Sequence, residues 1–378
     1  MILGIDLRSL PSDGSSGAGI AHASRAITRA LVDAVPSGWT IKAYIPSGAS
    51  IDVVGDSVEL AGSRRGDLID GLRRSPCDLL FVPSGAVPLN LPVPAIPWVH
   101  DLDIFEHPEW FPQSWLTRMR TTWMFRRGIE KAPMVFCVSE YTRRQIGARS
   151  EERSPFASRR LEASGDREAR RIVVTGEGGD EGLIDVTEEE RRKSKMRLTA
   201  YGIKENYLLM LGTVEPRKNL PFALSVLLPT TDYRLPTSFV IAGSDGWHIN
   251  SINRAIELAS KQHHIIRLRG VSDRLRRDLL ISASLVLVPS LSEGFGLVAL
   301  EAMQAGVPVI ASNRGALPEV AGESILPLSD PSAWTKTIDR ILSNNTFRQD
   351  WIEKQKRHVS RYSWKSAAEV VWRELNRS

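Results

Sequence analysis

The sequence predicts an α/β protein made of two Rossmann-like, doubly wound domains. Its 378 residues suffice for two domains, each with a core of its own. Two stretches, starting at residues 1 and 207, each open with a short apolar strand that runs into a turn and then a helical pattern. A third stretch, residues 285–320, reads as strand, glycine-rich turn, helix and a second strand at residues 307–310. This alternation is typical of parallel sheets covered by helices.

Composition is that of an ordinary globular protein, with 42% hydrophobic and 25% charged residues. No apolar run reaches the roughly 20 residues that span a bilayer, and the chain begins directly with a strand, so we expect neither a membrane span nor a signal peptide. Cys77 and Cys137 lie in apolar surroundings and predict buried thiols in a reducing compartment, hence a cytoplasmic protein. The net charge of +5 suits a polyanionic partner or an anionic membrane face.

The first domain is expected to span residues 1–185. It opens with a strand at residues 1–6, a glycine-containing loop, and a helix at residues 20–35. Gly17 and Gly19 in this loop form only a partial G-x-G, which a simple tight turn explains equally well.

His100 is a candidate functional residue because it ends an apolar strand, Ala95–Val99. Open α/β sheets place their ligand groups at the carboxyl ends of the strands. A histidine that merely caps the strand is the alternative. Asp101 and Asp103 also form a D-x-D triplet of the kind that binds metal, but such a triplet is common by chance and the strand–helix alternation argues against a metal site.

Residues 110–149 combine aromatic and basic side chains and contain few acids. The helical part of this stretch allows two interpretations. Its aromatic residues could face the core while its arginines are solvated, or it could be an interfacial helix that docks on anionic lipid headgroups. Nucleic acid is not expected, since no recognition motif accompanies the charge. The residues concerned are Trp110, Phe111, Trp115, Trp123, Met124 and Phe125, with Arg118, Arg120, Arg126, Arg127 and Lys131.

The second domain is expected to span residues 200–360, after a charged helix that begins with a capping box at Thr187. Its first strand ends at Gly212, and Arg217 with Lys218 follow in the turn. Two adjacent cations at a strand-to-helix turn suit a diphosphate, because arginine can hold two oxygens at once and lysine adds a point charge. A final helix, with Ser363 as its N-cap, closes the chain.

The glycine-rich turn lies between two acids, Glu293 and Glu301. The N–H groups of Gly294, Phe295, Gly296 and Leu297 lie at the start of a helix, Leu297–Gln304, where unpaired donors favour phosphate. Carboxylates repel phosphate but accept hydrogen bonds from vicinal hydroxyls. The pattern therefore predicts a nucleotide-sugar, with the sugar at Glu293, the diphosphate over the turn and the ribose at Glu301. A surface-capping Glu293 and an exposed Glu301 are the alternative.

The spacing of Glu293 and Glu301 resembles the E-x7-E signature of the large retaining glycosyltransferase family 4, which has the GT-B fold. The resemblance implies two Rossmann-like domains that face a cleft, with the acceptor on the first domain and the donor on the second. It also implies that the last helix, within residues 362–378, crosses back to the first domain. The family has a His-Asp pair in which the histidine contacts the transferred sugar, which gives that role to His100.

Further residues are assigned to the donor through this resemblance. The loop with Gly17 and Gly19 would approach the donor phosphates and the acceptor, Gly212 would end the strand beside the diphosphate, and Val271 would line the base pocket. Two departures from the family pattern are present. Thr213 replaces an arginine found in many relatives, and residues 175–180 replace an Asn-Gly-Val-Asp turn.

The G-T-x-E-P-R-K-N string that starts at Gly212 looks most like bacterial mannosyltransferases of polysaccharide assembly. The resemblance therefore implies transfer of mannose from GDP-mannose to a glycan or lipid-linked acceptor, with retention and without a metal. Arg217 and Lys218 would stabilise the leaving diphosphate in place of a metal. The alternatives are transfer from a UDP-sugar or another nucleotide-sugar, an enzyme of another class on the same architecture, such as a nucleotide-sugar 2-epimerase, and a non-catalytic nucleotide-sugar-binding subunit.

Overall fold

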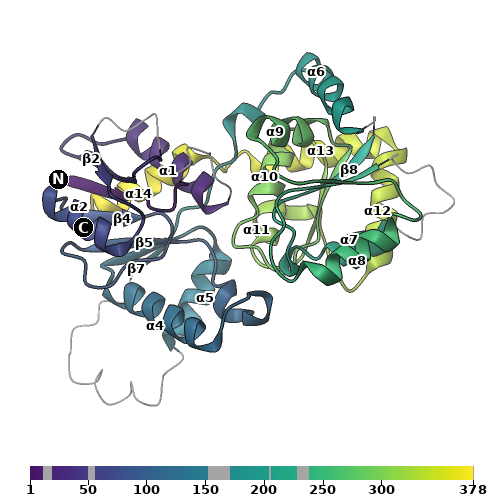
Figure 1. Ribbon diagram of the computed structural model, residues 1–378. Helices are drawn as coiled ribbons and strands as arrows, with labels where there is room; N and C mark the ends of the chain where they lie inside the picture. The colour runs from purple at the N-terminus through teal and green to yellow at the C-terminus, as the bar shows by residue number, and fades with distance from the viewer. Residues whose placement is uncertain (12–18, 50–55, 152–170, 204–205, 228–237, 378) are drawn as a thin grey trace. The chain divides into compact units, whose positions relative to one another are not determined.

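The computed structural model describes the chain except for residues 12–18, 50–55, 152–170, 204–205, 228–237 and 378. The chain divides into two compact units (Figure 1). The first contains Met1–Glu106, Gln113–Gly178 and Tyr362–Ser378, and the second contains His107–Pro112 and Gly179–Arg361. Each unit is built on one parallel sheet, so the predicted α/β class with two Rossmann-like domains is confirmed.

The first unit has a seven-stranded sheet in the order β3-β2-β1-β4-β5-β6-β7. Its described strands are β1 (Ile2–Asp6), β2 (Thr40–Pro46), β3 (Ser57–Leu60), β4 (Leu79–Val82), β5 (Ala95–Val99), β6 (Met134–Cys137) and β7 (Arg171–Val174). Its described helices are α1 (Ile20–Asp33), α2 (Arg65–Arg74), α3 (Asp103–Glu106), α4 (Trp115–Lys131), α5 (Glu140–Glu151) and α14 (Trp364–Leu375).

The C-terminal helix α14 packs on α1 of the first unit, as the sequence predicted (Figure 1). Ser363 caps it, with its Oγ accepting a hydrogen bond from the N–H of Ser366 at 3.0 Å. Trp372 anchors the contact. Its indole Nε1–H donates to the Leu31 carbonyl at 3.0 Å, and its ring lies edge-on to Trp39 at 5.4 Å between centroids.

The second unit has a six-stranded sheet in the order β10-β9-β8-β11-β12-β13. Its described strands are β8 (Tyr207–Leu211), β9 (Ser238–Ala242), β10 (Ile265–Leu268), β11 (Leu285–Val288), β12 (Val309–Ser312) and β13 (Ile325–Leu326). Its described α-helices are α6 (Glu188–Leu198), α7 (Leu220–Leu227), α8 (Ile249–Ala259), α9 (Asp273–Ser282), α10 (Leu297–Gln304), α11 (Leu317–Ala321), α12 (Pro331–Ser343) and α13 (Asn345–Val359). Short 3-10 turns lie at η1 (Pro108–Trp110), η2 (Glu181–Leu183), η3 (Thr199–Tyr201), η4 (Pro216–Lys218) and η5 (Gly322–Ser324).

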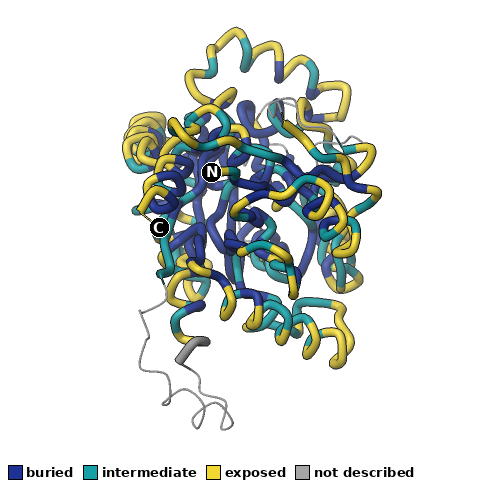
Figure 2. The backbone as a smooth tube through the Cα atoms, turned by 90° about the vertical axis from the view of Figure 1, so that its left-hand side faces the viewer, coloured by how far each residue is buried: buried dark blue, intermediate teal, exposed yellow. Residues whose placement is uncertain are grey.

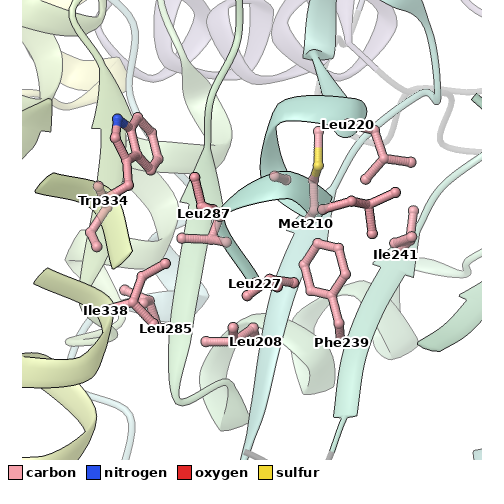
Figure 3. Packing of buried hydrophobic residues seen from close by; sticks show 14 of the residues in the cluster. Leu208, Met210, Leu220, Leu227, Phe239, Ile241, Leu285, Leu287, Trp334 and Ile338 are labelled. Atoms are coloured by element: carbon pink, nitrogen blue, oxygen red, sulfur yellow. The ribbon is translucent and has the colours of Figure 1, made fainter. Parts of the chain in front are cut away.

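Side chains from alternate strand positions form the core on one face of the second sheet (Figure 3). They pack against α7, α8 and α12, and the labelled members are Leu208, Met210, Phe239, Ile241, Leu285 and Leu287 with Leu220, Leu227, Trp334 and Ile338. The intervening residues Leu209, Val240 and Val286 are buried as well. Burial of both faces is what a parallel sheet with helical crossovers requires. The four strands β8, β9, β11 and β12 are buried along their whole length, and buried segments form the dark blue interior of Figure 2.

Most predicted elements are found close to their expected bounds. The helix Leu297–Gln304 and the capping box at Thr187 are confirmed. The strand expected at residues 307–310 instead begins at Val309. The shift has two causes. The Val307 N–H donates to the Ala302 carbonyl of the preceding helix at 2.9 Å, and Pro308 has no N–H to donate to the sheet. None of the described helices combines the length and apolar character that a bilayer crossing needs.

Candidate functional site

Three of the predicted residues meet around the Glu293 carboxylate in the second unit. Lys218 Nζ lies 2.6 Å from Glu293 Oε1, and Arg217 Nη1 lies 2.9 Å from Oε2. The Ser290 hydroxyl donates to Oε1 at 2.7 Å. Glu293 is only 7% exposed, so the alternative of a surface-capping glutamate is wrong. The sequence-predicted sugar-binding acid and both predicted diphosphate-binding cations therefore form one cluster, which we call the Glu293 cluster.

The Glu293 cluster fixes the charge of its carboxylate. Burial alone would raise the pKa of Glu293, but the charges of Lys218 and Arg217, with hydrogen bonds from Lys218 and Ser290, lower the pKa to about 2. The carboxylate is thus ionised throughout the physiological range. An ionised carboxylate can only accept hydrogen bonds, which suits it to sugar hydroxyls and excludes a role as a proton donor.

Two loops at the carboxyl edge of the second sheet hold this cluster. One follows β8 and carries Arg217, and the other follows β11 and carries Glu293. The Leu291 N–H donates to the Arg217 carbonyl at 2.8 Å, and the Asn219 side chain donates to the Pro289 carbonyl at 3.1 Å. The backbones of the loops are therefore tied together independently of the ion pairs.

Gly315, in the loop after β12, supports Glu293 from behind. The Ala316 N–H donates to the Glu293 carbonyl at 2.8 Å. Gly315 has a φ of +60°, and a Cβ at this position would lie 2.5 Å from the backbone N and O of Glu293. A side chain here would displace the Glu293 backbone, so glycine is required for the loops to approach each other.

The helix α10 begins beside the cluster. Gly296, with a φ of 103°, is its N-cap and provides no capping side chain. Gly294, Phe295 and Gly296 are buried, and Leu297 is partly buried. Binding of a diphosphate by the amides of this turn remains a prediction.

Glu301 is fully buried, so the alternative of an exposed helix glutamate is wrong. Arg276, from α9, donates through Nη2 to Glu301 Oε2. Gly179 lies against the same part of α10, where a Cβ would come within 3.2 Å of Glu301 Cγ. The ribose role assigned to Glu301 remains a prediction, and a ribose would have to share this carboxylate with Arg276.

His100 lies in the first unit, directly after β5. Its Nδ1 is 3.0 Å from Glu177 Oε1, and its Nε2 is 2.7 Å from the Pro83 carbonyl. Both neighbours are acceptors, so the protonated ring, with a hydrogen on each nitrogen, can donate to both of them. Burial lowers the pKa of His100, but the hydrogen bond and charge of Glu177 outweigh it and leave the pKa raised. The sugar contact assigned to His100 remains a prediction.

Glu177 and Arg276 were not selected from the sequence. Glu177 is buried and follows β7. His100 follows β5 of the same parallel sheet, so both residues lie at the carboxyl edge of that sheet. Two polar residues that each follow a strand of the same parallel sheet were the available signal. Arg276 carried no comparable signal, because it lies within a helix among other arginines.

The remaining predicted residues are placed as follows. Gly212, after β8, has a φ of 125° and lies next to Lys218, whose Nζ would be 3.8 Å from a Cβ at this position. Val271, after β10, is partly buried. Gly19 is the N-cap of α1 with a φ of 56°, and Gly17 lies outside the described residues. Within the described residues, no group of three or more His, Cys, Asp and Glu side chains is arranged to hold a metal ion.

Helix α4 exposes much of its apolar surface. Trp115 is 62% exposed, Leu116 69%, Met119 53% and Trp123 55%, whereas Phe125 packs on Phe105 at 5.0 Å between ring centroids. The interpretation that the aromatic residues of this helix face the core is therefore wrong for Trp115 and Trp123. Such a set of exposed apolar residues beside arginines is typical of an interaction surface.

Comparison with known proteins supports the class that the fold and the Glu293 cluster indicate. Residues 191–358 match the family model described as Glycosyl transferases group 1. The O-antigen chain mannosyltransferase B of Escherichia coli is 29% identical over 279 residues, which cover 72% of this chain and 67% of that protein. For seven further curated relatives, the matched stretch spans 26–54% of their length.

Two solved structures share the fold over nearly the whole chain. Sucrose-phosphate synthase from Thermosynechococcus elongatus has a TM-score of 0.71 at 18% identity, covering 100% of this chain and 98% of that one. WaaG, a glycosyltransferase involved in lipopolysaccharide biosynthesis, has a TM-score of 0.69 at 15% identity, covering 98% of both chains. The chain thus has the GT-B fold. Together with the family match, this supports a group 1 glycosyltransferase.

Proposed function

We propose that the protein is a retaining, family 4 glycosyltransferase that transfers mannose from GDP-mannose to a hydroxyl of a glycan or lipid-linked oligosaccharide. The observation that carries the proposal is the Glu293 cluster, in which one ionised carboxylate and two cations occupy the carboxyl edge of a nucleotide-binding type of sheet. The choice of mannose is supported by the name of the Escherichia coli relative.

The Glu293 cluster suits the charges of this reaction. Breaking the anomeric C–O bond leaves negative charge on the departing diphosphate. Lys218 is held by its ion pair with Glu293, whereas Arg217 pairs with both Glu293 and Glu215 and also donates to the Ser292 carbonyl at 3.2 Å. Both cations can turn from Glu293 to that diphosphate, which would supply the negative charge that they leave. Glu293, released from them in part, accepts hydrogen bonds from the sugar hydroxyls. In this proposal the two cations stabilise the leaving group without a metal.

A nucleotide-sugar panel tests the donor. We expect GDP-mannose to raise the melting temperature more than UDP-glucose, UDP-N-acetylglucosamine or ADP-glucose, because mass action stabilises the state that binds. A larger shift with a UDP-sugar would refute the GDP-mannose donor, and no shift with any nucleotide-sugar would refute the function. NMR of GDP-mannose incubated without acceptor should show unchanged donor; an epimerised sugar would indicate an epimerase.

Lys218→Ala should weaken GDP binding by about 10- to 100-fold, which corresponds to about 1–3 kcal/mol, the scale of a hydrogen bond to a charged group. The reason is that Lys218 is one of the two cations expected to bind the diphosphate. Isothermal titration calorimetry with GDP measures the change. Lys336→Ala, an exposed lysine of α12, is the control and should bind GDP like the wild type. Unchanged GDP affinity in Lys218→Ala would contradict the proposal that this lysine binds the donor diphosphate.

We further propose that α4 binds an anionic membrane surface, at which a lipid-linked acceptor would be presented. The exposed Trp115, Leu116, Met119 and Trp123 supply the apolar part of this contact, and the arginines of the same helix supply the charge.

Replacing the four arginines of α4 with glutamine should abolish most binding to phosphatidylglycerol vesicles, since each basic residue near such a surface contributes about 1 kcal/mol. The variant changes Arg118, Arg120, Arg126 and Arg127. A matched variant of four exposed arginines around α2, at positions 64, 65, 73 and 74, removes the same charge. Vesicle co-sedimentation should show a loss in the α4 variant alone; equal losses would indicate a general charge effect and contradict a docking role.

A further inference from the structure

A cavity of about 760 Å³ lies in the second unit, away from the Glu293 cluster. Part of its wall comes from residues at the starts of three strands: Asn206 directly precedes β8, Ser284 directly precedes β11, and Val307 lies two residues before β12. The cavity is therefore at the amino edge of the sheet. Glu293 follows a strand and lies at the opposite, carboxyl edge, so a ligand in this cavity would occupy a second site.

Four cations line the cavity from two helices. Arg191 and Lys195 come from α6, and Arg348 and Lys356 come from α13. The two acids of the lining, Glu188 and Glu353, are exposed, and the contact from Glu188 to Arg191 is 3.6 Å. Elsewhere in the described part of the chain no carboxylate pairs with the other three cations. The lining thus carries excess positive charge.

The two guanidinium groups are held in place by backbone carbonyls. Arg191 donates to the carbonyls of Ile281 and Ala305, near the ends of α9 and α10, and Arg348 donates to the carbonyl of Ser284 at 2.5 Å. Such bonds cap helix ends, which explains part of their role. A guanidinium has five N–H groups, however, so donors remain on both residues. The carbonyls orient these donors and do not neutralise them.

The positive charges of the lining lie close enough to destabilise one another. Burial lowers the pKa of Arg191, and burial followed by the charge of Arg191 lowers the pKa of Arg348. Gly306 lets a third cation approach: a Cβ there would lie 3.4 Å from Lys356 Nζ and 3.6 Å from Arg191 Nη2. An anion between these groups would relieve their repulsion.

Uncharged polar groups line the cavity as well. The Ser282 side chain is buried, and among the described residues its Oγ has no hydrogen-bond partner. Buried hydroxyl groups are rarely left unsatisfied, so this one indicates a missing partner. Asn206, Ser284 and Gln349 add amide and hydroxyl groups that can bind a polyol.

We propose that this cavity binds a hexose phosphate. Arginine forks with an added lysine are the usual partners of a phosphate, and the serine and amide groups suit the sugar hydroxyls. The volume lies within the range of 300–1,000 Å³ that is typical of small-molecule sites, which is too large for inorganic phosphate alone. The site is independent of the proposed donor site and of the transfer reaction.

Calorimetric titration of the full-length protein with glucose 6-phosphate, mannose 6-phosphate and mannose 1-phosphate tests the proposal, with glucose and sodium sulfate at matched ionic strength as references. At least one hexose phosphate should bind, and at least 10-fold more tightly than either reference. Lys356→Gln and Arg348→Gln should each weaken this binding at least 10-fold. Lys356 has no hydrogen bond within the described residues, so its variant tests binding even if Arg348→Gln fails to fold.

Two controls identify the site. Lys354→Gln removes the same charge from α13 but lies outside the cavity lining, where Lys354 pairs with Glu323 at 3.5 Å, and it should bind within twofold of the wild type. Lys218→Ala should also bind hexose phosphate normally; a loss there would place the ligand in the donor site. That result, the absence of binding by all three hexose phosphates, or normal binding by Lys356→Gln would overturn the proposal.

Discussion

Replacing Glu293 with glutamine should lower the rate of sugar transfer by at least about 100-fold, the effect of removing one preorganised polar group from a transition-state site. Glutamine keeps the size of the side chain but loses the charge that holds Lys218 and Arg217. The affinity for GDP should not fall, because the variant leaves both cations available to the diphosphate. Steady-state kinetics with GDP-mannose and calorimetry with GDP measure the two effects separately.

The same substitution should destabilise the ligand-free protein. Breaking a buried ion pair by removing one partner costs about 3–5 kcal/mol. The charge left without its carboxylate is that of Lys218, since Arg217 keeps its pair with Glu215. GDP should restore part of this loss by supplying the missing negative charge. Urea unfolding with and without GDP measures it. Asp245→Asn, which removes a less buried acid paired with Arg267 and Arg269, is the control and should cost less and show no rescue by GDP. A near-normal transfer rate in Glu293→Gln would contradict the role of Glu293.

The architecture was predictable because the local signals agree with one another. Apolar runs ended by glycine or proline define the strands, and capping residues such as Thr187 and Ser363 define helix starts. Bounds were less predictable where the backbone had competing partners. Val307 looks like a strand residue, but its N–H completes the end of α10, so the strand begins two residues later.

The members of the Glu293 cluster could be selected from the sequence, but their contacts could not. Lys218 and Glu293 are 75 residues apart, and only the adjacency of β8 and β11 in the sheet brings them together. The prediction assigned the cations to the phosphate and the acid to the sugar. It did not anticipate that both cations pair with this acid, or that Glu215 is a second partner of Arg217. Ser290 was missed because a serine in a loop gives no signal of its own.

Helix α4 shows why composition alone left its role open. Its aromatic and basic residues alternate without a clear apolar face, so periodicity did not separate a packed helix from an exposed one. The structure distinguishes the two cases residue by residue: Trp123 is exposed, while Phe125 packs on Phe105. Which residues of a mixed helix reach the core is decided by the neighbouring elements and not by the helix itself.

Glu177→Gln should produce a stability loss that depends on pH. In the wild type the protonated form of His100 can donate to Glu177 and to the Pro83 carbonyl, and the pKa of His100 is raised. A raised pKa in the folded state means that this interaction stabilises the protein fully below the unfolded pKa of about 6.5 and is lost as the pH rises through the folded value. Removing the carboxylate should therefore cost about 1.5–3 kcal/mol at pH 6, the range for a hydrogen bond between charged groups.

The difference between wild type and Glu177→Gln should shrink at alkaline pH, above the folded pKa of His100. There the imidazole is neutral in both proteins, and the glutamine amide can donate to the ring nitrogen that has lost its proton. Urea unfolding at pH 6 and pH 9 measures the difference, and NMR titration should show a lower His100 pKa in the variant. Glu109→Gln is the matched control, because the His107–Glu109 pair is largely exposed and should contribute less than about 0.5 kcal/mol at either pH. A loss of equal size at both pH values would mean that Glu177 acts through packing alone, and His100 would then be neutral with one of its two contacts unfavourable.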